Sequence, residues 1–93
     1  MAKLRCDNVT AGLRASEAVA VFVDVEGRRH FIRVERDFLW DEGGSSFLPV
    51  GVIHVDPKSK CVLIELPQEA ETGANRLWVK PDQLDEQQVE AFA

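Results

Sequence analysis

The sequence has only two cysteines, Cys6 and Cys61, in 93 residues. Two thiols are too few for a disulfide framework, and they form no Cys-x-x-Cys pair, so we expect a reducing compartment, with a single bridge left open. The longest apolar run, 18–23, is much shorter than the roughly 20 residues that cross a bilayer. No apolar segment follows the basic start, so no secretory signal is expected. These absences predict a cytoplasmic protein that does not enter a membrane.

The chain also lacks an excess of basic residues. Its 11 Lys and Arg stand against 16 Asp and Glu, a formal net charge of -5. Nucleic-acid phosphates and anionic membranes both attract basic surfaces, so the charge disfavours them as main partners. The excess acid lies after residue 40, and a local basic patch in the first 40 residues stays open.

The composition, with 45% hydrophobic and 29% charged residues, predicts one folded domain over 1–93. Valine and isoleucine gather in short runs, which favours strands. Residues 1–17 give only a weak pattern, and 18–80 read as a β meander. We expect 81–93 to form a helical tail, because proline followed by an acidic residue is typical of a helix start.

Residues 18–25 and 29–39 form the clearest predicted hairpin, because runs of branched residues flank a turn that contains glycine. Gly27 and Arg28 fit the two-residue loop of a type II′ turn, whose first position needs a positive φ. This register pairs Glu26 with Arg29, Val25 with His30, Val23 with Ile32, and Val21 with Val34. The valines and their partners are then predicted to face the core.

The opposite face of this hairpin mixes large aromatic side chains with charge. It carries Phe22, Phe31 and Arg33 as predicted neighbours, with Arg28 and Arg29 at the tip. Aromatic rings beside arginine on a strand surface can hold a peptide, anchor a protein partner or stack bases. Two interpretations stay open: this face binds a partner or a second copy of the chain, or the C-terminal helix covers it.

A second hairpin is predicted where 50–55 and 60–66 flank the sequence Asp-Pro-Lys-Ser at 56–59. Aspartate can close an Asx turn there, and proline presets φ at the second turn position. The register decides whether His54 meets Cys61. They face each other across a two-residue loop, and they lie on opposite faces if the turn takes an extra residue.

Residues 41–46 and 68–75 are polar, acidic and glycine-containing, so both are predicted loops. A short closing strand is expected at 77–80. The whole reads as a mainly β fold, a small antiparallel barrel or curled sheet of about five strands with a short C-terminal helix. The order of elements over 18–84, with the closing strand and following turn at 78–84, resembles SH3-like barrels in general layout. This resemblance carries no functional residues.

A metal-binding or thiol-dependent protein that uses Cys61, His54 and His30 is one alternative. These side chains are of the right types for zinc, but structural zinc sites usually take ligands in local pairs, and the sequence has none. A cysteine nucleophile needs a histidine base and an electropositive setting. No set of nucleophile, base and oxyanion donors is recognisable, so we expect neither an enzyme nor a cofactor.

The leading prediction is a non-enzymatic interaction module that binds a protein or peptide. Trp40 and Trp78 lie at strand ends, where aromatic rings can line a groove, and the acidic loops would flank it. A homodimer through Phe22 and Phe31 is the second form of this prediction. A weak nucleic-acid binder is the remaining alternative, and its residues would be Arg28, Arg29, Arg33 and Arg36.

Overall fold

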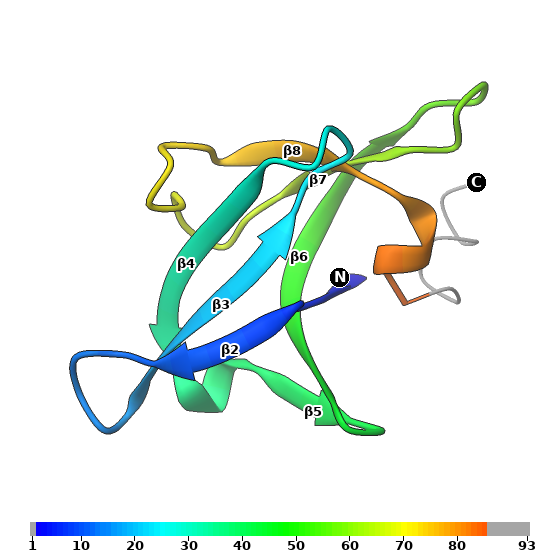
Figure 1. Ribbon diagram of the computed structural model, residues 1–93. Coiled ribbons are helices and arrows are strands. Elements are labelled where there is room, and N and C mark those ends of the chain that lie inside the picture. Colours follow the sequence, from blue (N-terminus) through cyan, green and yellow to red (C-terminus); the bar gives the residue numbers. More distant parts are fainter. Residues whose placement is uncertain (1, 86–93) are drawn as a thin grey trace.

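A computed structural model describes residues 2–85, and within that range the chain forms strands and two short 3-10 turns (Figure 1). The strands are β1 (Ala2–Arg5), β2 (Asn8–Ala11), β3 (Glu17–Val23), β4 (Arg29–Glu35), β5 (Trp40–Glu42), β6 (Ser45–Val55), β7 (Val62–Glu65) and β8 (Arg76–Val79). The 3-10 turns are η1 (Arg36–Phe38) and η2 (Pro81–Gln83). None of the helical segments described is long and apolar enough to cross a membrane.

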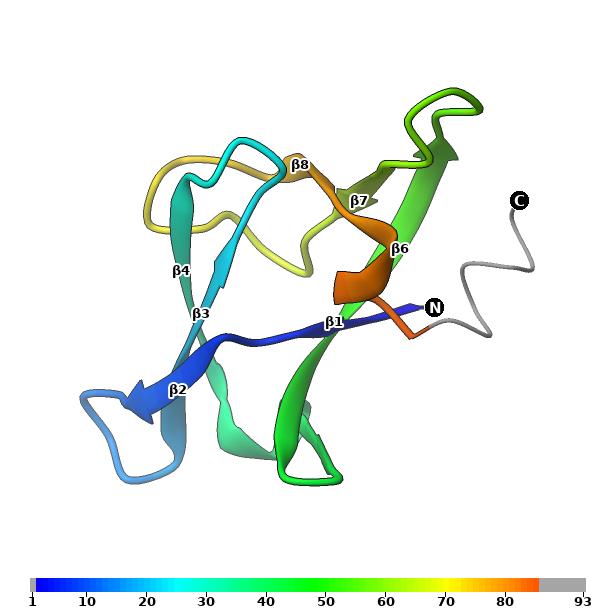
Figure 2. The same ribbon diagram turned by 45° about the vertical axis from the view of Figure 1, so that its right-hand side comes forward.

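The strands form two antiparallel sheets. One runs in the order β1-β6-β7-β8, with β5 also paired to β6, and the other runs β2-β3-β4. Between β1 and β2 the backbone serves both sheets, because Cys6 N–H donates to Ser46 O and Asp7 N–H donates to Val21 O. Figure 2 shows this bent connection and the strongly curved β6. The N-terminal segment, whose own pattern is weak, therefore links the two sheets.

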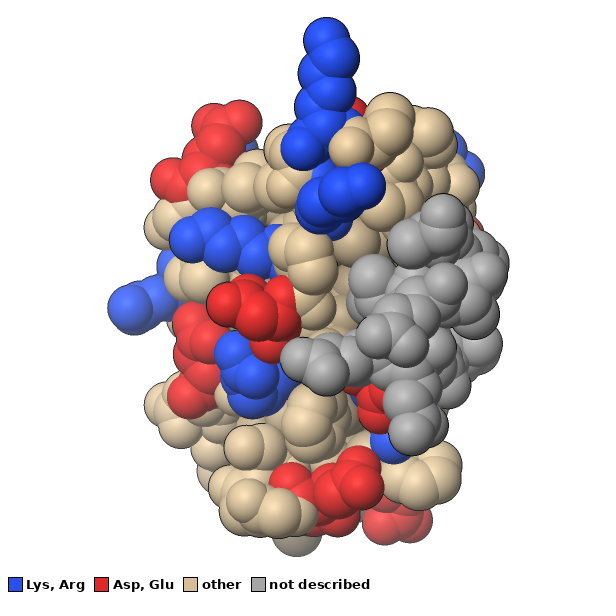
Figure 3. All heavy atoms as spheres, turned by 90° about the vertical axis from the view of Figure 1, so that its right-hand side faces the viewer, with Lys and Arg blue, Asp and Glu red and all other residues tan. Residues whose placement is uncertain are grey.

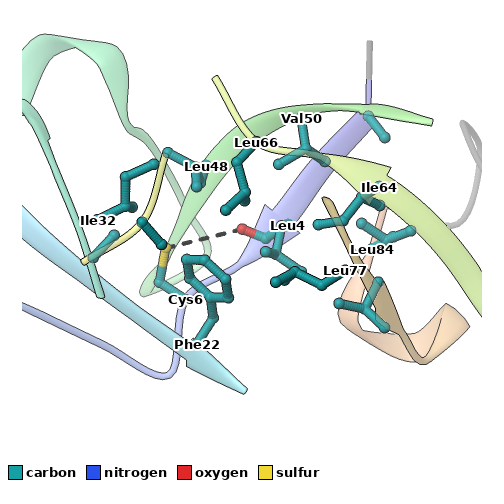
Figure 4. Close-up of a cluster of buried hydrophobic side chains, with 14 of the residues drawn as sticks. Leu4, Cys6, Phe22, Ile32, Leu48, Val50, Ile64, Leu66, Leu77 and Leu84 are labelled. Atoms are coloured by element: carbon teal, nitrogen blue, oxygen red, sulfur yellow. Dashed lines mark hydrogen bonds between the residues drawn. The ribbon is translucent and has the colours of Figure 1, made fainter. Parts of the chain in front are cut away.

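The core fills the space between the sheets, and its side chains come from both of them (Figure 4). Strand β4 shows why the sequence folds this way, since its residues alternate strictly between exposed and buried. The fold is mainly β, as the sequence predicts. Over residues 2–85, however, eight strands replace the five expected, and the two curled sheets do not close into a barrel.

The β3–β4 hairpin closes through a three-residue loop, one residue longer than predicted. Asp24 N–H donates to Arg28 O at 2.9 Å, and Gly27 N–H donates to Asp24 O at 2.9 Å. The carboxylate oxygen Oδ1 of Asp24 also accepts the backbone N–H groups of Glu26 and Arg28. Gly27 has a φ of 83°, as expected for the left-handed residue that ends such a loop. Asp24 therefore favours the longer loop.

This loop moves the register by three positions, so that Val21 lies opposite Phe31 and not Val34. An odd shift inverts the face of one strand relative to the other, because successive strand side chains point to opposite sides. The inward residues are Ala18, Ala20, Phe22, His30, Ile32 and Val34. Ile32 and Val34 line the core as predicted. The valines of β3 do not point into it, although Val21 is only 8% exposed on the outer side of the sheet. The predicted placing of Phe22 on the outer face beside Phe31 is wrong.

Two further turns differ from the sequence prediction. Residues 41–46 are a tight hairpin between β5 and β6 and not a loop, with φ angles of 59° at Gly43 and 83° at Gly44 that fit a type I′ turn. In the β6–β7 turn, Asp56 N–H donates to Cys61 O, which leaves a loop of more than two residues. The Asx turn predicted there is confirmed, since Asp56 Oδ1 accepts the N–H of Lys58.

The predicted helical tail is described only at its beginning. Pro81–Gln83 form one turn of 3-10 helix, η2, and residues 86–93 lie outside the described range. Gln83 anchors this turn, because its Oε1 accepts Lys80 N–H and its Nε2 donates to Val23 O. Leu84 is buried and bridges to Leu4. The start of the tail therefore closes one end of the core.

Candidate functional site

The β3–β4 loop docks on the edge strand β8, and this junction forms the candidate site. Val25 N–H donates to Trp78 O at 2.8 Å, so the loop is hydrogen-bonded to the strand. Figures 1 and 2 both show the loop lying against β8. Two segments far apart in the sequence, 24–28 and 74–78, therefore form opposite walls of one surface feature.

His30 braces this junction from the inside. Its ring is 2% exposed and stacks on Phe22 with the ring centroids 5.9 Å apart. Nε2 lies 2.9 Å from Oδ2 of Asp24, and Nδ1 lies 2.7 Å from the hydroxyl of Thr72. An ionised carboxylate only accepts hydrogen bonds, so Nε2 carries a proton, and in the neutral ring Nδ1 accepts from Thr72. His30 thus ties the 67–75 connection to the hairpin.

The carboxylate of Asp24 is the centre of this network. Burial alone would raise its pKa, but the hydrogen bonds from His30 and from the backbone of Arg28 and Glu26 together outweigh burial. The pKa of Asp24 is therefore lowered from its ordinary value. The group is ionised at neutral pH, the state in which it accepts its three hydrogen bonds, from His30, Glu26 and Arg28, most strongly.

Thr72, His30 and Asp24 follow the order of a hydroxyl, imidazole and carboxylate triad, so catalysis must be considered. The open space beside this chain of groups is lined by Asp24 and His30, but Thr72 is not among its lining residues. A nucleophile has to face the space that a substrate occupies. The geometry therefore fits a brace that fixes the loop and not a nucleophile with its base.

The space itself is a pocket of about 210 Å³ between the β3–β4 loop and β8. Its apolar lining comes from Val25, Ala74, Leu77 and Trp78. Its charged lining comes from Asp24, Glu26, Arg28 and Arg76. Trp78 is 36% exposed, and its outer side meets the ring of His54 edge-on at 6.3 Å. The pocket therefore combines a tryptophan wall with a lining that is about equally apolar and charged, including two arginines.

Some backbone N–H and C=O groups of β8 point towards the pocket and away from β7. Leu66 N–H donates to Asn75 O, which fixes which residues of β8 hydrogen-bond to β7. In an antiparallel ladder, alternate residues direct both their N–H and C=O groups to the same side. Arg76 and Trp78 therefore direct their backbone groups away from β7, where Trp78 O already accepts Val25 N–H. The pocket consequently lies along a strand edge with hydrogen-bonding capacity.

The structure does not bring Trp40 and Trp78 into one groove. Trp40 is 58% exposed on β5 beside Phe47, with Lys3 Nζ 4.8 Å from the centre of its ring. Trp78 lies beyond Leu63, which pairs with His54 at the other end of β6. Phe47 and His54 are seven positions apart on β6, a span of roughly 23 Å in an extended strand. The acidic segment 41–46 lies next to Trp40 and not next to Trp78.

The other predicted binding residues are divided between the two faces of β3 and β4. Phe22 is 0% exposed and belongs to the core, whereas Phe31 is 38% exposed on the outer face. Arg33 is on that outer face too, with Nη2 at 3.9 Å from Oε1 of Glu71. Glu71 N–H also donates to Phe31 O, so the 67–75 connection covers part of the free edge of β4.

The residues of the metal or thiol alternative are not assembled. His30 is buried in the network with Asp24, and His54 lies opposite Leu63 and not opposite Cys61. Over residues 2–85, no three His, Cys, Asp or Glu side chains gather closely enough to hold a metal ion. Cys61 is partly exposed, contrary to the buried thiol that its apolar neighbours predict.

The two thiols should differ in reactivity towards a thiol reagent. Cys6 is 8% exposed, and burial, with a smaller contribution from the charge of Asp7, raises its pKa to about 11. Only the thiolate reacts, so Cys6 is protected both by access and by protonation. We expect Cys61 to be labelled at pH 8 while Cys6 is labelled only after unfolding. Mass spectrometry of a labelling time course measures both, and equal rates in the folded protein would contradict this arrangement.

Charges of both signs lie on the surface. On the face shown in Figure 3, basic side chains gather at the top and acidic ones at the bottom, and the two signs mix in between. Two of the four arginines of the nucleic-acid alternative have acidic or backbone contacts, since Arg33 lies near Glu71 and Arg36 donates to Glu17 O. A scan against protein-family models and searches of curated proteins and solved structures find nothing that matches this chain.

Proposed function

We propose that this protein is a non-enzymatic interaction module that binds a short segment of a partner protein in the pocket beside Trp78. The observation that supports this most is the combination of a 36% exposed tryptophan with an adjacent pocket of about 210 Å³ that has both apolar and charged walls. Tryptophan and arginine are the residues most enriched at energetically dominant contacts in protein interfaces. Because Cys6 and Cys61 are free, a reducing, cytoplasmic setting suits the module.

The size of the pocket favours a peptide side chain over a cofactor. Small-molecule sites usually enclose roughly 300–1,000 Å³, so this pocket suits one apolar side chain packed between Val25 and Trp78. An extended segment could place that side chain in the pocket while its backbone meets the outward groups of Arg76. This is binding at a strand edge, with the pocket supplying the specificity.

Arg28 and Arg76 can pair with an acidic residue next to that apolar side chain, although Glu26 in the same lining opposes it. Arg28 is exposed at the rim, and Arg76 is exposed beside it, with its Nε 3.0 Å from Glu65 Oε2. The carboxylate of Asp24 is already occupied by its hydrogen bonds, so it repels a ligand less than a free carboxylate would. A guanidinium group binds a carboxylate through two parallel hydrogen bonds.

A peptide array tests this proposal. Each peptide would be about seven residues long with a central Leu, Phe or Trp flanked by Asp or Glu, and a second set would carry Lys instead. We expect the acidic set to be preferred. We also expect Trp78→Ala to weaken the best peptide at least about tenfold, as loss of a dominant contact does.

Trp40→Ala is the matched control, because it removes the other exposed tryptophan far from the pocket. Its affinity should equal that of the wild type by isothermal titration calorimetry. Unchanged affinity in Trp78→Ala, or equal losses in both variants, would contradict the proposal. Arg28→Gln should lower affinity for the acidic peptides and leave that for neutral peptides unchanged.

A further inference from the structure

The outward face of β3 and β4 forms a second surface that the peptide pocket does not use. Its side chains lie in four cross-strand rows: Val23 with Arg29, Val21 with Phe31, Val19 with Arg33, and Glu17 with Glu35. We call these eight residues the β3–β4 outer face. Strand β2 extends it, since Asn8 lies beside Val21 and Thr10 beside Val19.

This face is unusually apolar for the solvent side of a sheet. Antiparallel sheets with one solvated face usually place polar side chains outward, but three successive outward positions of β3 are Val19, Val21 and Val23. Phe31 adds an exposed ring beside them. Val21 is only 8% exposed and Val19 and Val23 are half-buried, so Phe31, at 38%, is the main exposed apolar group of this face.

The charges at the two ends of the face are opposite in sign. Arg29 lies in the first row, and Glu17 and Glu35 form the last row. Arg29 and Glu35 are both exposed. Arg33 lies in the third row, directly before the acidic row and next to Phe31 along β4. A surface with an apolar centre and opposite charges at its ends is complementary to itself when it is turned end to end.

We propose that the β3–β4 outer face binds the same face of a second copy of this chain. The twofold axis lies in the plane between the two copies and runs perpendicular to the β3 and β4 strands. The axis reverses the row order, so Arg29 of one copy meets Glu35 of the other. In the middle rows, Phe31 meets the guanidinium of Arg33, a favourable cation–π pair. The half-buried Val19 lies over Val21, which is only 8% exposed and adds little. Each of these contacts occurs twice, as in any isologous dimer.

The charges select this axis over the other twofold arrangement in the same plane. An axis parallel to the strands keeps the row order, so the row of Arg29 would face the same row of the other copy and Arg29 would gain no acidic partner. The acidic rows would also face each other, which is unfavourable. Only the axis across the strands brings opposite charges together at both ends.

The dimer should be weak and reversible. Strands β3 and β4 are seven residues long and β2 is four, so at a spacing of about 4.8 Å the face covers at most roughly 14 by 23 Å on each copy. The two copies together would bury about 600 Å², less than the roughly 1,000 Å² of a stable interface, which fits only a weak, transient contact. We therefore expect monomer at low micromolar concentration and a growing fraction of dimer towards about 0.5 mM.

Charge exchange with sedimentation equilibrium tests both the surface and its orientation. Arg29→Glu alone and Glu35→Arg alone each place like charges together in a homodimer, and each should raise the dimer dissociation constant at least about tenfold. An equimolar mixture of the two variants pairs opposite charges at both ends. It should therefore regain dimer at wild-type affinity, which also shows that both variants are folded.

Lys58→Glu is the control variant. It makes the same charge change as Arg29→Glu at an exposed residue of the β6–β7 turn, and its dissociation constant should match that of the wild type. Three results would overturn the proposal: a wild-type protein that stays monomeric at about 0.5 mM, a dimer insensitive to the two exchanges, or a mixture that fails to regain dimer.

Discussion

Replacing Phe22 by alanine should lower the free energy of unfolding by about 3–5 kcal/mol, because its fully buried ring leaves a cavity between the sheets. Phe31→Ala should cost less than about 1 kcal/mol, since its ring is on the outer face. Urea unfolding at low micromolar concentration, where the chain is monomeric, measures both. The comparison tests the register of the β3–β4 hairpin.

The register predicted from the sequence places both phenylalanines on one outer face, and it therefore gives similar losses for the two variants. If Phe22→Ala does not fold, Phe22→Leu supplies the same comparison, with an expected cost of about 1–2 kcal/mol from the smaller cavity. A larger loss for Phe31 than for Phe22 would contradict the structure.

Replacing Asp24 by alanine should lower the free energy of unfolding by about 2–4 kcal/mol. The variant leaves Nε2 of the buried His30 and two backbone N–H groups without their acceptor. The loop that forms one wall of the pocket should loosen as well. Hydrogen exchange at Val25, whose N–H bonds to Trp78 O, should therefore speed up more than exchange in β6 or β7.

The hydrogen bonds of Asp24 should make the stability of the protein depend on pH in the acid range. The pKa of Asp24 is lower in the folded state, so its ionised form stabilises the fold fully above the unfolded value of about 4. That contribution is lost as the pH falls through the folded pKa. Asp24→Asn removes the titration while its amide oxygen still accepts the loop N–H groups. It should flatten, but not abolish, the loss of stability below pH 4, because the pKa of Asp56 is lowered too.

The pH dependence of stability and hydrogen exchange at Val25 both test whether Asp24 holds the loop in place. A wild-type protein and an Asp24→Asn variant with the same slope of unfolding free energy against pH below 4 would contradict the hydrogen-bonded network around Asp24. If the hydrogen bonds of Asp24 are intact but the N–H of Val25 still exchanges fast, the network does not hold the loop against β8.

The sequence predicted the parts of the fold that depend on neighbouring residues. The alternation of β4, the positive φ at Gly27 and the Asx turn at Asp56 all follow from local patterns. The loop length of the first hairpin depends instead on which backbone groups the Asp24 carboxylate accepts. The pattern Asp-x-x-Gly over 24–27 is typical of a type I turn and was the signal for the longer loop.

Long-range contacts account for what the sequence did not predict. Strands β1 and β2 are stabilised by pairing with β6 and β3, so residues 2–11 carry little local signal. Thr72 reaches His30 across 42 positions, and no spacing rule marks such a pair. Trp78 was predicted as a binding residue, but its pocket depends on the docking of the β3–β4 loop, which only the tertiary structure shows.

Chemical-shift mapping of the bound state tests the proposed function most directly. The ¹⁵N-labelled protein would be titrated at low micromolar concentration with the best acidic peptide from the array. We expect the largest chemical-shift changes at Val25, Arg28, Arg76 and the indole of Trp78. Trp40 and the β3–β4 outer face should change little. Saturable shifts centred on Trp40 or on Phe31, with the Trp78 indole unmoved, would contradict the proposed function.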